Sequence, residues 1–474
     1  MALKFFRIDE FAGIDQAREE SAVPFSMSPD ACNMDTQNGA LAVAKGYMRH
    51  IPEPIPGAGE IHALAVFARR EGDMFVAAAG DSLYAWDGAA WQTVYTYPGG
   101  LARHRFDFEQ AQIDAVNYLL VGCGEQQLVK FDGTAASLFG SAAGVSDIPA
   151  LYLAMYRGRL FSAGDPNHPN RLYWSQLPGD GRSIENWGPV EASPNVEGGH
   201  AEAGSVSSDP IVGLAALSNQ LVIFKEHSVY RLLGDRPGNF TIEEVDSRAE
   251  RTANTAVVKC GDALYFMTAG GLACFNGVTA EPLRDARRIR GLLKTGDVSA
   301  SRGALCRDKL YFSMTDAEGD ALIEYDLVRA TYMLRRGFSV RGLCARAGAL
   351  YLADGNRRVC RFNEGDTYDG APIAAWWRTP ETDLREKSAV KGMRALYLRG
   401  SSDARQSATL VDVTAGAVTQ THRLLLPERS CDVLEVPLKN EGRTFSLTFR
   451  NEAGGHFELT SGAEIEFELK RRTI

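Results

Sequence analysis

The side chains most often used for proton transfer and metal binding are the histidines, of which the sequence has eight. They are His50, His62, His104, His168, His200, His227, His422 and His456. No two lie within four residues of each other, so the H-E-x-x-H zinc signature is excluded. The sequence also lacks the G-x-S-x-G nucleophile elbow, the P-loop and a dinucleotide-binding glycine motif after a strand. We therefore expect no enzymatic activity, no metal and no cofactor, since a catalytic site would have to be assembled from distant loops.

The eight cysteines show no metal-binding or disulfide pattern. They are Cys32, Cys123, Cys260, Cys274, Cys306, Cys344, Cys360 and Cys431, and no two form a C-x-x-C pair. We expect free thiols that act as small apolar side chains.

An acidic turn and the six tryptophans are further candidates for ligand binding. The turn at residues 363–366, together with Asp369, could offer oxygen ligands to calcium, but it lacks the spacing of a calcium-binding loop, so a plain turn is predicted. The tryptophans could stack on sugars, but in a repeat-built β fold they more often fill the core, which we favour. They are Trp86, Trp91, Trp174, Trp187, Trp376 and Trp377.

Basic residues cluster within residues 283–294, which have the pattern of a short amphipathic helix. They are Arg284, Arg287, Arg288, Arg290 and Lys294. These side chains could contact DNA or the carboxylates of a neighbouring subunit, and the alternative is an ordinary solvated face.

The elements that would carry these residues are short strands that contain a recurring phrase. The phrase is an alternating apolar run followed by Asp-Gly or Asn-Gly, as at residues 83–88, 128–133 and 272–277, with looser copies at 322–326 and 359–363. Such dipeptides after alternating apolar residues predict hairpins with type I′ turns. The repeating units number about seven and are spaced roughly 37 to 57 residues apart, a period typical of β-propellers. We predict an all-β fold with a seven-bladed propeller over residues 61–369, with six blades or a β-sandwich as alternatives.

The regions on either side of the predicted propeller have a different character. Residues 1–60 are interrupted by Gly, Pro and Asn but contain Phe5, Phe6, Phe11, Ile14, Phe25 and Tyr47. We expect an extended arm for assembly that docks on a neighbouring protein and becomes ordered when it does so. Residues 370–474 contain cleanly alternating segments, which predict a separate C-terminal β-sandwich.

Charge and hydropathy restrict the possible partners. The chain has 474 residues, with 51 basic and 60 acidic side chains, and its net charge of −9 argues against a tight grip on nucleic acid. No run of about eighteen apolar residues occurs, so no membrane span is expected. The N-terminus lacks the long apolar segment of a signal peptide, and we expect synthesis in the cytoplasm.

Four passages, taken in order, resemble one protein family. The first comprises residues 11–15, then Asn33, residues 39–41 and residues 46–47, and the second comprises residues 157–164, 171–175 and 186–187. The third is residues 221–234, and the fourth is residues 367–373, continuing through residues 377–379 to Lys391. Together they are similar to the β-propeller tail proteins of bacteriophages, which include the packaged-DNA stabilisation hub and the tail nozzle of short-tailed phages.

The resemblance implies a structural component of the virion tail, assembled in the host cytoplasm. Such proteins form a ring of identical copies below the portal, commonly a hexamer, and help to retain and then conduct the packaged DNA. The implied partners are copies of the same chain, the portal, adaptor or other tail proteins, and phage DNA in transient contact.

Two other functions remain open. One is a receptor- or glycan-binding tail module, which a propeller with a sandwich also permits. The other is a propeller glycosidase, which would need paired carboxylates about 5 to 10 Å apart in the central cavity. The sequence contains none of the S-x-D-x-G-x-T-W boxes expected of sialidase-like sites.

Overall fold

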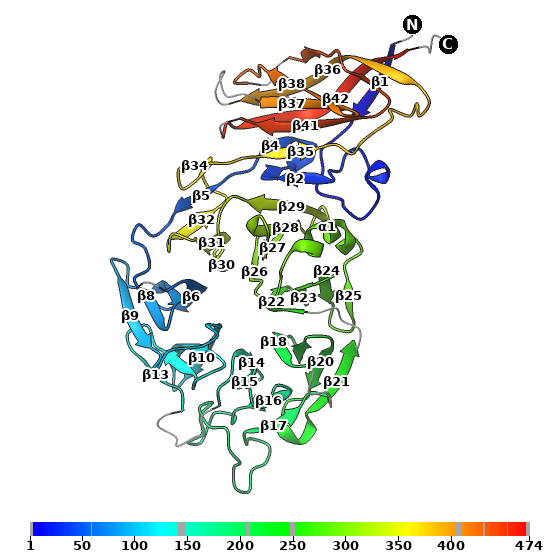
Figure 1. The fold of residues 1–474 in the computed structure, drawn as a ribbon. Coiled ribbons are helices and arrows are strands. Elements are labelled where there is room, and N and C mark those ends of the chain that lie inside the picture. Colours follow the sequence, from blue (N-terminus) through cyan, green and yellow to red (C-terminus); the bar gives the residue numbers. More distant parts are fainter. Residues whose placement is uncertain are drawn as a thin grey trace.

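The computed structural model describes residues 3–57, 59–140, 148–204, 209–246, 252–402, 409–429, 432–452 and 454–470. The fold is all-β, with a ring of small antiparallel sheets and a two-sheet sandwich packed on one side of the ring (Figure 1). The few helices are η1 (Glu20–Ala22), η2 (Gln37–Gly39), η3 (Pro237–Asn239), η4 (Ala286–Ile289) and α1 (Arg290–Thr295). None of these described helices has the length and apolar character needed to cross a membrane.

Six sheets of the ring have four strands each, in sequence order from the inside outwards. The first blade comprises β6 (Ile61–Arg69), β7 (Gly72–Ala79), β8 (Ser82–Trp86) and β9 (Trp91–Thr96). The second comprises β10 (Asp107–Ile113), β11 (Val116–Gly122), β12 (Val129–Phe131) and β13 (Ala136–Leu138). The third comprises β14 (Tyr152–Tyr156), β15 (Arg159–Ala163), β16 (Arg171–Trp174) and β17 (Gly199–Glu202). The fourth comprises β18 (Ile211–Leu217), β19 (Gln220–Lys225), β20 (Val229–Leu233) and β21 (Thr241–Asp246). The fifth comprises β22 (Thr252–Cys260), β23 (Ala263–Thr268), β24 (Gly271–Phe275) and β25 (Ala280–Pro282), and the sixth comprises β26 (Gly303–Cys306), β27 (Lys309–Asp316), β28 (Gly319–Asp326) and β29 (Thr331–Arg336).

The seventh blade is closed by a strand from the N-terminal region. Its sheet has the order β30 (Gly342–Arg346), β31 (Ala349–Ala353), β32 (Val359–Phe362), β5 (Tyr47–Arg49), β33 (Thr367–Tyr368) and β34 (Ala371–Pro372). β5 is antiparallel to β32, with Phe362 opposite Tyr47. The innermost strand of this blade, β30, lies against β6 of the first blade, which completes the ring. The prediction of a seven-bladed propeller is therefore confirmed.

The recurring phrase marks the outermost turn of a blade, but the turn type differs from the prediction. Trp86 pairs with Trp91, so the loop between β8 and β9 has four residues and not two. The Asp87 carboxylate accepts hydrogen bonds from the backbone N–H groups of Ala89 and Ala90, at 2.8 and 2.7 Å. Asp132, Asn276 and Asp326 accept equivalent pairs in later blades. The acidic or amide side chain thus replaces the tight backbone turn, which explains why the phrase recurs.

The sandwich combines the end of the chain with its beginning. One sheet contains β3 (Met34–Asp35), β4 (Leu41–Val43), β42 (Phe457–Lys470), β36 (Val390–Ser402) and β39 (Leu434–Pro437), with β1 (Leu3–Ile8) on β42 and β40 (Glu441–Gly442) on β36. The other contains β2 (Asp30–Cys32), β35 (Trp376–Arg378), β41 (Phe445–Asn451), β37 (Thr409–Ala415) and β38 (Val418–Leu424).

The interpretation of residues 1–60 as an arm that docks on a neighbouring protein needs correction. Its described part lies within the chain's own fold, adding strands to both sandwich sheets and to the seventh blade. Phe11 and Ile14 are 1% exposed, and the Phe11 ring meets the edges of Trp377 and Phe449 at 5.0 and 5.7 Å between ring centroids. The sequence pattern indicated correctly that Phe11 and Ile14 need an apolar partner, but the partner is the same molecule, and Phe5 stays 54% exposed.

The buried apolar core is continuous between the two domains. One cluster contains side chains of blades five to seven, of the N-terminal segment and of both sandwich sheets, among them Leu322, Ile14, Trp377 and Ile465. Because interiors of this kind are close-packed, the sandwich and the propeller form one body and not two domains on a flexible linker.

Candidate functional site

The third blade carries an irregular segment at residues 175–198, between β16 and β17. A fully buried guanidinium, that of Arg159, holds this segment in place. It donates hydrogen bonds to the carbonyl oxygens of Ser175 at 2.5 Å and of Asn195 and Glu197 at 2.8 Å. Burial lowers the pKa of Arg159 from its ordinary value, because the carbonyl groups replace water as acceptors without supplying a full negative charge. The loop is therefore anchored from beneath by one side chain.

Backbone hydrogen bonds within the segment give it a fixed shape. The N–H of Gln176 donates to the carbonyl of Asn186 at 2.7 Å, and the N–H of Leu177 donates to the carbonyl of Val196 at 2.9 Å. The Gln176 amide side chain donates to the carbonyl of Gly188 at 3.0 Å. These bonds flank Trp187, which is 8% exposed. The loop places this indole ring at a defined position beside the blade.

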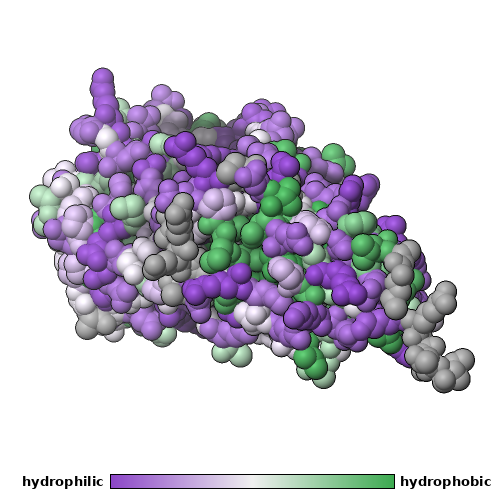
Figure 2. All heavy atoms as spheres, turned by 90° about the horizontal axis from the view of Figure 1, so that it is seen from above, coloured by the Kyte–Doolittle hydropathy of each residue, from purple (hydrophilic) through white to green (hydrophobic). Residues whose placement is uncertain are grey.

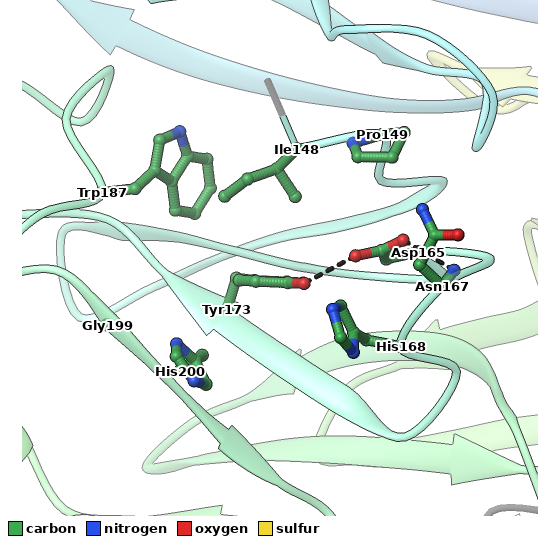
Figure 3. A pocket seen from close by; sticks show the side chains of 9 residues that line it. All are labelled: Ile148, Pro149, Asp165, Asn167, His168, Tyr173, Trp187, Gly199 and His200. Carbon is green, nitrogen blue, oxygen red and sulfur yellow. Dashed lines mark hydrogen bonds between the residues drawn. The ribbon is translucent and has the colours of Figure 1, made fainter. Parts of the chain in front are cut away.

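A cavity of about 350 Å³ lies beneath Trp187 (Figure 3). It is lined by Ile148, Pro149, Asp165, Asn167, His168, Tyr173, Trp187, Gly199 and His200. Tyr173 comes from β16 and His200 from β17, whereas Asp165, Asn167 and His168 belong to the turn between β15 and β16. We refer to this cavity as the third-blade pocket.

The polar groups of the third-blade pocket are held in place by hydrogen bonds. The Tyr173 hydroxyl donates to one carboxylate oxygen of Asp165 at 2.6 Å, and the N–H of Asn167 donates to the other at 2.9 Å. Burial and then this bond to Asp165 raise the pKa of Tyr173 to about 12, so the hydroxyl stays protonated. His168, His200 and Asn167 are exposed at the rim. The pocket combines buried aromatic rings with accessible donors and acceptors, as ligand sites commonly do.

The same geometry offers little for catalysis. Among the described residues that line the pocket, Asp165 is the single carboxylate, and its two oxygens already accept hydrogen bonds. Within the described residues, no group of three or more His, Cys, Asp or Glu side chains is arranged to hold a metal ion. What the pocket presents to solvent is a set of hydrogen-bonding side chains at its rim, those of Asn167, His168 and His200.

The glycosidase alternative needs a pair of carboxylates, and Asp107 and Glu109 lie on the innermost strand of the second blade. Burial raises the pKa of Asp107 to about 6, and burial followed by the charge of Asp107 raises that of Glu109 to about 7. Asp107 accepts a hydrogen bond from the N–H of Leu153 in the third blade at 2.9 Å. Asp107 and Glu109 are two residues apart on β10, so their side chains point to the same side of the sheet. The hydrogen bond to Leu153 gives Asp107 a role in joining the second and third blades.

The predicted basic cluster begins at Arg284, in the turn before η4, and continues along η4 and α1, between the fifth and sixth blades. Its apolar side, formed by Ala286, Ile289 and Leu293, is buried, so the amphipathic pattern was interpreted correctly. Arg288 is half-buried, donates to the carbonyl of Ala330 at 2.9 Å and approaches Asp15 at 3.9 Å, so it serves the contact with the N-terminal segment.

The other four basic residues form a group that we call the basic helix face. Arg284, Arg287, Arg290 and Lys294 are all exposed. Across the described ranges, none of these four side chains forms an ion pair or hydrogen bond.

The other candidates from the sequence are the acidic turn, the tryptophans and the cysteines. Asp369 of the acidic turn pairs with Arg49 at 2.8 Å and with Arg358 at 2.6 Å, which occupies the oxygens that calcium would need. Trp91, Trp174, Trp187 and Trp377 are buried, and Trp86 and Trp376 are partly exposed. The seven described cysteines are free, and Cys431 lies outside the described residues. Sequence reasoning missed that His168 and His200 meet in one pocket, since only the pairing of β16 with β17 brings them together.

The chain was compared with known proteins. No family model matches it, and no curated protein matches it. Among solved structures, it is similar to the extracellular domain of a hybrid two-component system of B. thetaiotaomicron, with 13% identity and a TM-score of 0.45, over 67% of this chain and 39% of that one. It is also similar to the Neurospora crassa Pan2 WD40 domain, with 12% identity and a TM-score of 0.40, over 68% of this chain and 94% of that one. A third similarity is to PorZ, a surface component of the type-IX secretion system of Porphyromonas gingivalis, with 11% identity and a TM-score of 0.39, over 78% of this chain and 46% of that one. The assignment of the fold to the propeller class rests on the sheet topology itself.

Proposed function

We propose that the protein is a non-enzymatic structural component of a bacteriophage tail, forming a hub or nozzle ring below the portal that retains and then conducts packaged DNA. The observation that supports this most is the N-terminal segment, which joins the sandwich and the propeller through strands of both. A wall around a DNA path has to transmit force without its parts moving apart. A continuous core and shared strands provide that rigidity.

The ring needs contact surfaces, and most of the N-terminal segment cannot supply them because residues such as Phe11 and Ile14 are buried in the chain's own fold, whereas Phe5 at its start is exposed. Figure 2 looks down on the sandwich end and shows hydrophobic residues gathered in a band across the middle of this face. A groove of about 600 Å³ on the sandwich is lined by Phe5 and Val433, which are 54% and 51% exposed. We propose that a second copy of the chain occupies this groove.

Charge complementarity indicates which part of the second copy fits. In the lining of the groove, the Tyr397 hydroxyl donates to Glu466 at 2.8 Å. The pKa of Tyr397 is raised to about 12, first by this bond and also by the charges of Glu435 and Glu464. The lining of the groove also contains Arg7 and Arg399, and Arg7 pairs with Glu464, so the negative charge lies mainly with Glu466 and the nearby Glu435. We propose that this part of the groove faces the basic helix face of a neighbouring copy. Because the two surfaces differ, the contact is head-to-tail, which is the type that closes rings; a hexamer is our proposal.

The charge of the whole chain suits a conduit. A net charge of −9 keeps phosphates from binding tightly along the path, so contact with DNA would be transient. The proposal includes the portal, adaptor or other tail proteins as neighbours and the virion as the location.

Purified particles test the proposal directly. We expect mass spectrometry of particles from the culture that carries the gene to detect the protein, and cryo-electron microscopy to locate it as a ring on the DNA axis. Absence from particles, a position at a fibre tip, or release of sugar from bacterial polysaccharide by the purified protein would each contradict it.

Charge reversal tests the contact between copies. Arg287→Glu together with Arg290→Glu should abolish incorporation into particles, and adding Glu435→Arg should restore it at least in part. Arg70→Glu, at an exposed arginine of the first blade, is the matched control and should have no effect. Normal incorporation of the double variant would show that this face is not the interface.

A further inference from the structure

We propose that the third-blade pocket binds a neutral hexopyranose unit, such as a hexose or an N-acetylhexosamine of a surface polysaccharide. This inference goes beyond the structural role proposed above, and neither depends on the other.

The first argument is that a buried charged side chain holds the loop beside the pocket in a fixed shape. Arg159 is 0% exposed, and its guanidinium donates hydrogen bonds to backbone carbonyls of the irregular segment at residues 175–198. Burying a charged group costs free energy unless hydrogen bonds compensate it, so a loop held in this way has a fixed shape. Fixed geometry lowers the entropy lost when a ligand binds.

The lining is the second argument. A pyranose ring presents apolar C–H groups on its faces and hydroxyl groups around its edge. Trp187 and Tyr173, which are 8% and 9% exposed, line the cavity with the parts of their rings that could meet these faces. The imidazoles of His168 and His200 and the amide of Asn167 can each donate or accept at the edge. A volume of about 350 Å³ is enough for one or two sugar units.

Charge is the third argument and selects a neutral ligand. Lys and Arg are missing from the described residues that line the pocket, and Asp165 lies 4% exposed within it. A carboxylate, phosphate or sulfate on the ligand would approach Asp165, which is unfavourable in a partly buried site. Arg171, whose guanidinium lies 5.9 Å from the centre of the Tyr173 ring, is already paired with Glu202 at 2.8 Å. A ligand cation would find the Asp165 oxygens already accepting hydrogen bonds from Tyr173 and Asn167.

A glycan array that carries neutral and acidic bacterial saccharides is the first test. We expect binding to neutral hexose or N-acetylhexosamine termini and not to uronic or sialic acids. Titration of the full-length protein with free glucose, galactose and N-acetylglucosamine should then change tryptophan fluorescence. Trp187→Phe should remove most of the fluorescence change and retain binding, because an aromatic face remains.

Rim variants provide the control for folding. His168→Ala and Asn167→Ala should each weaken sugar binding by tenfold or more and leave the thermal midpoint unchanged, because both side chains are exposed. His227→Ala, at an exposed histidine of the fourth blade, should change neither quantity. The inference is overturned if no neutral sugar binds, if acidic sugars bind better, or if the rim variants bind as well as the wild type. Failure of the sugar test with normal incorporation into particles would leave the structural proposal intact.

Discussion

The Tyr368 hydroxyl donates a hydrogen bond of 2.9 Å to the side-chain oxygen of Asn33, far away in the sequence. The same oxygen accepts from the N–H of Arg336 at 2.9 Å, and the Asn33 amide donates to the carbonyls of Arg336 and Ala374 at 2.9 and 2.8 Å. Asn33 is 2% exposed, and its backbone has a φ of +54°, a region that asparagine adopts more readily than most residues. One amide thus joins the N-terminal segment, the sixth blade and the chain leading into the sandwich.

Asn33→Ala should destabilise the protein by about 2–4 kcal/mol, because it leaves several buried donors and acceptors unpaired and strains the backbone. Chemical denaturation followed by circular dichroism measures this change. Asn38→Ala is the matched control, since Asn38 has a φ of +56° but an exposed side chain. Equal losses in the two variants would mean that the backbone conformation, and not the hydrogen-bond network, is responsible.

Arg159→Met should destabilise the third blade by roughly 2–4 kcal/mol, because the carbonyl oxygens of Ser175, Asn195 and Glu197 lose this donor in a buried site. The segment at residues 175–198 should become sensitive to limited proteolysis before the rest of the chain unfolds. Mapping of the first cleavage sites by mass spectrometry measures this. The neighbouring Arg157→Met, at an exposed side chain, should leave the cleavage pattern unchanged, and a first cut elsewhere in the Arg159 variant would contradict the anchoring role.

Glu109→Gln should stabilise the protein at high pH and have little effect at low pH. The folded-state pKa of about 7 lies above the ordinary value of 4.5, so the folded protein binds this proton more tightly than the unfolded chain does. Stability contributed by this group is therefore lost as the pH rises through the window between these values. We expect the variant to be more stable by roughly 1–2 kcal/mol at pH 8, less than the full shift implies because the side chain keeps some contact with water, and equal to the wild type near pH 4.

Thermal melts of Glu109→Gln and wild type across pH 4 to 8 measure the difference. Glu53→Gln, at an exposed carboxylate, should give curves parallel to those of the wild type. A stability difference for Glu109→Gln that does not change with pH would show that ionisation of this group is not the cause.

Glu324→Gln should cost about 3 kcal/mol or more, because it leaves Arg335 charged and buried without its partner. Arg335 is 1% exposed and makes two hydrogen bonds to one Glu324 oxygen, at 2.9 and 3.1 Å. Equilibrium unfolding measures the loss. Glu318→Gln, whose carboxylate is 74% exposed and 3.4 Å from Arg336, is the control and should change stability by less than about 0.5 kcal/mol.

The sequence was sufficient to predict the propeller because each blade repeats the same local solution. Asp87, Asp132 and Asn276 each cap an outer turn through their side chains, and this local chemistry leaves a recognisable phrase. The third-blade pocket has no such local mark. His168 and His200 meet through the pairing of β16 with β17 across the irregular segment, which is a long-range property of the fold.

The local sequence pattern also could not predict which chain the N-terminal segment packs against. The residues around Phe11 show that an apolar partner is needed, but the pattern does not say whether the partner is the same chain. The strand register shows that the partner is the same chain, since Leu3 lies opposite Glu468 and Leu41 opposite Leu459 at the other end of the sequence.

The closure of the seventh blade by β5 has a consequence for biosynthesis. The ribosome makes β5 among the first strands of the chain and β32 near the end of the propeller, so the ring cannot close during most of translation. The sandwich also cannot be completed early, because β1 pairs with β42, the last strand to leave the ribosome. Contacts between such distant segments make folding slow and cooperative, and they leave apolar strands uncovered while the chain is being made. The nascent polypeptide should therefore depend on chaperones until its final residues are released, and premature termination anywhere in the sandwich should yield insoluble product and not a stable free propeller.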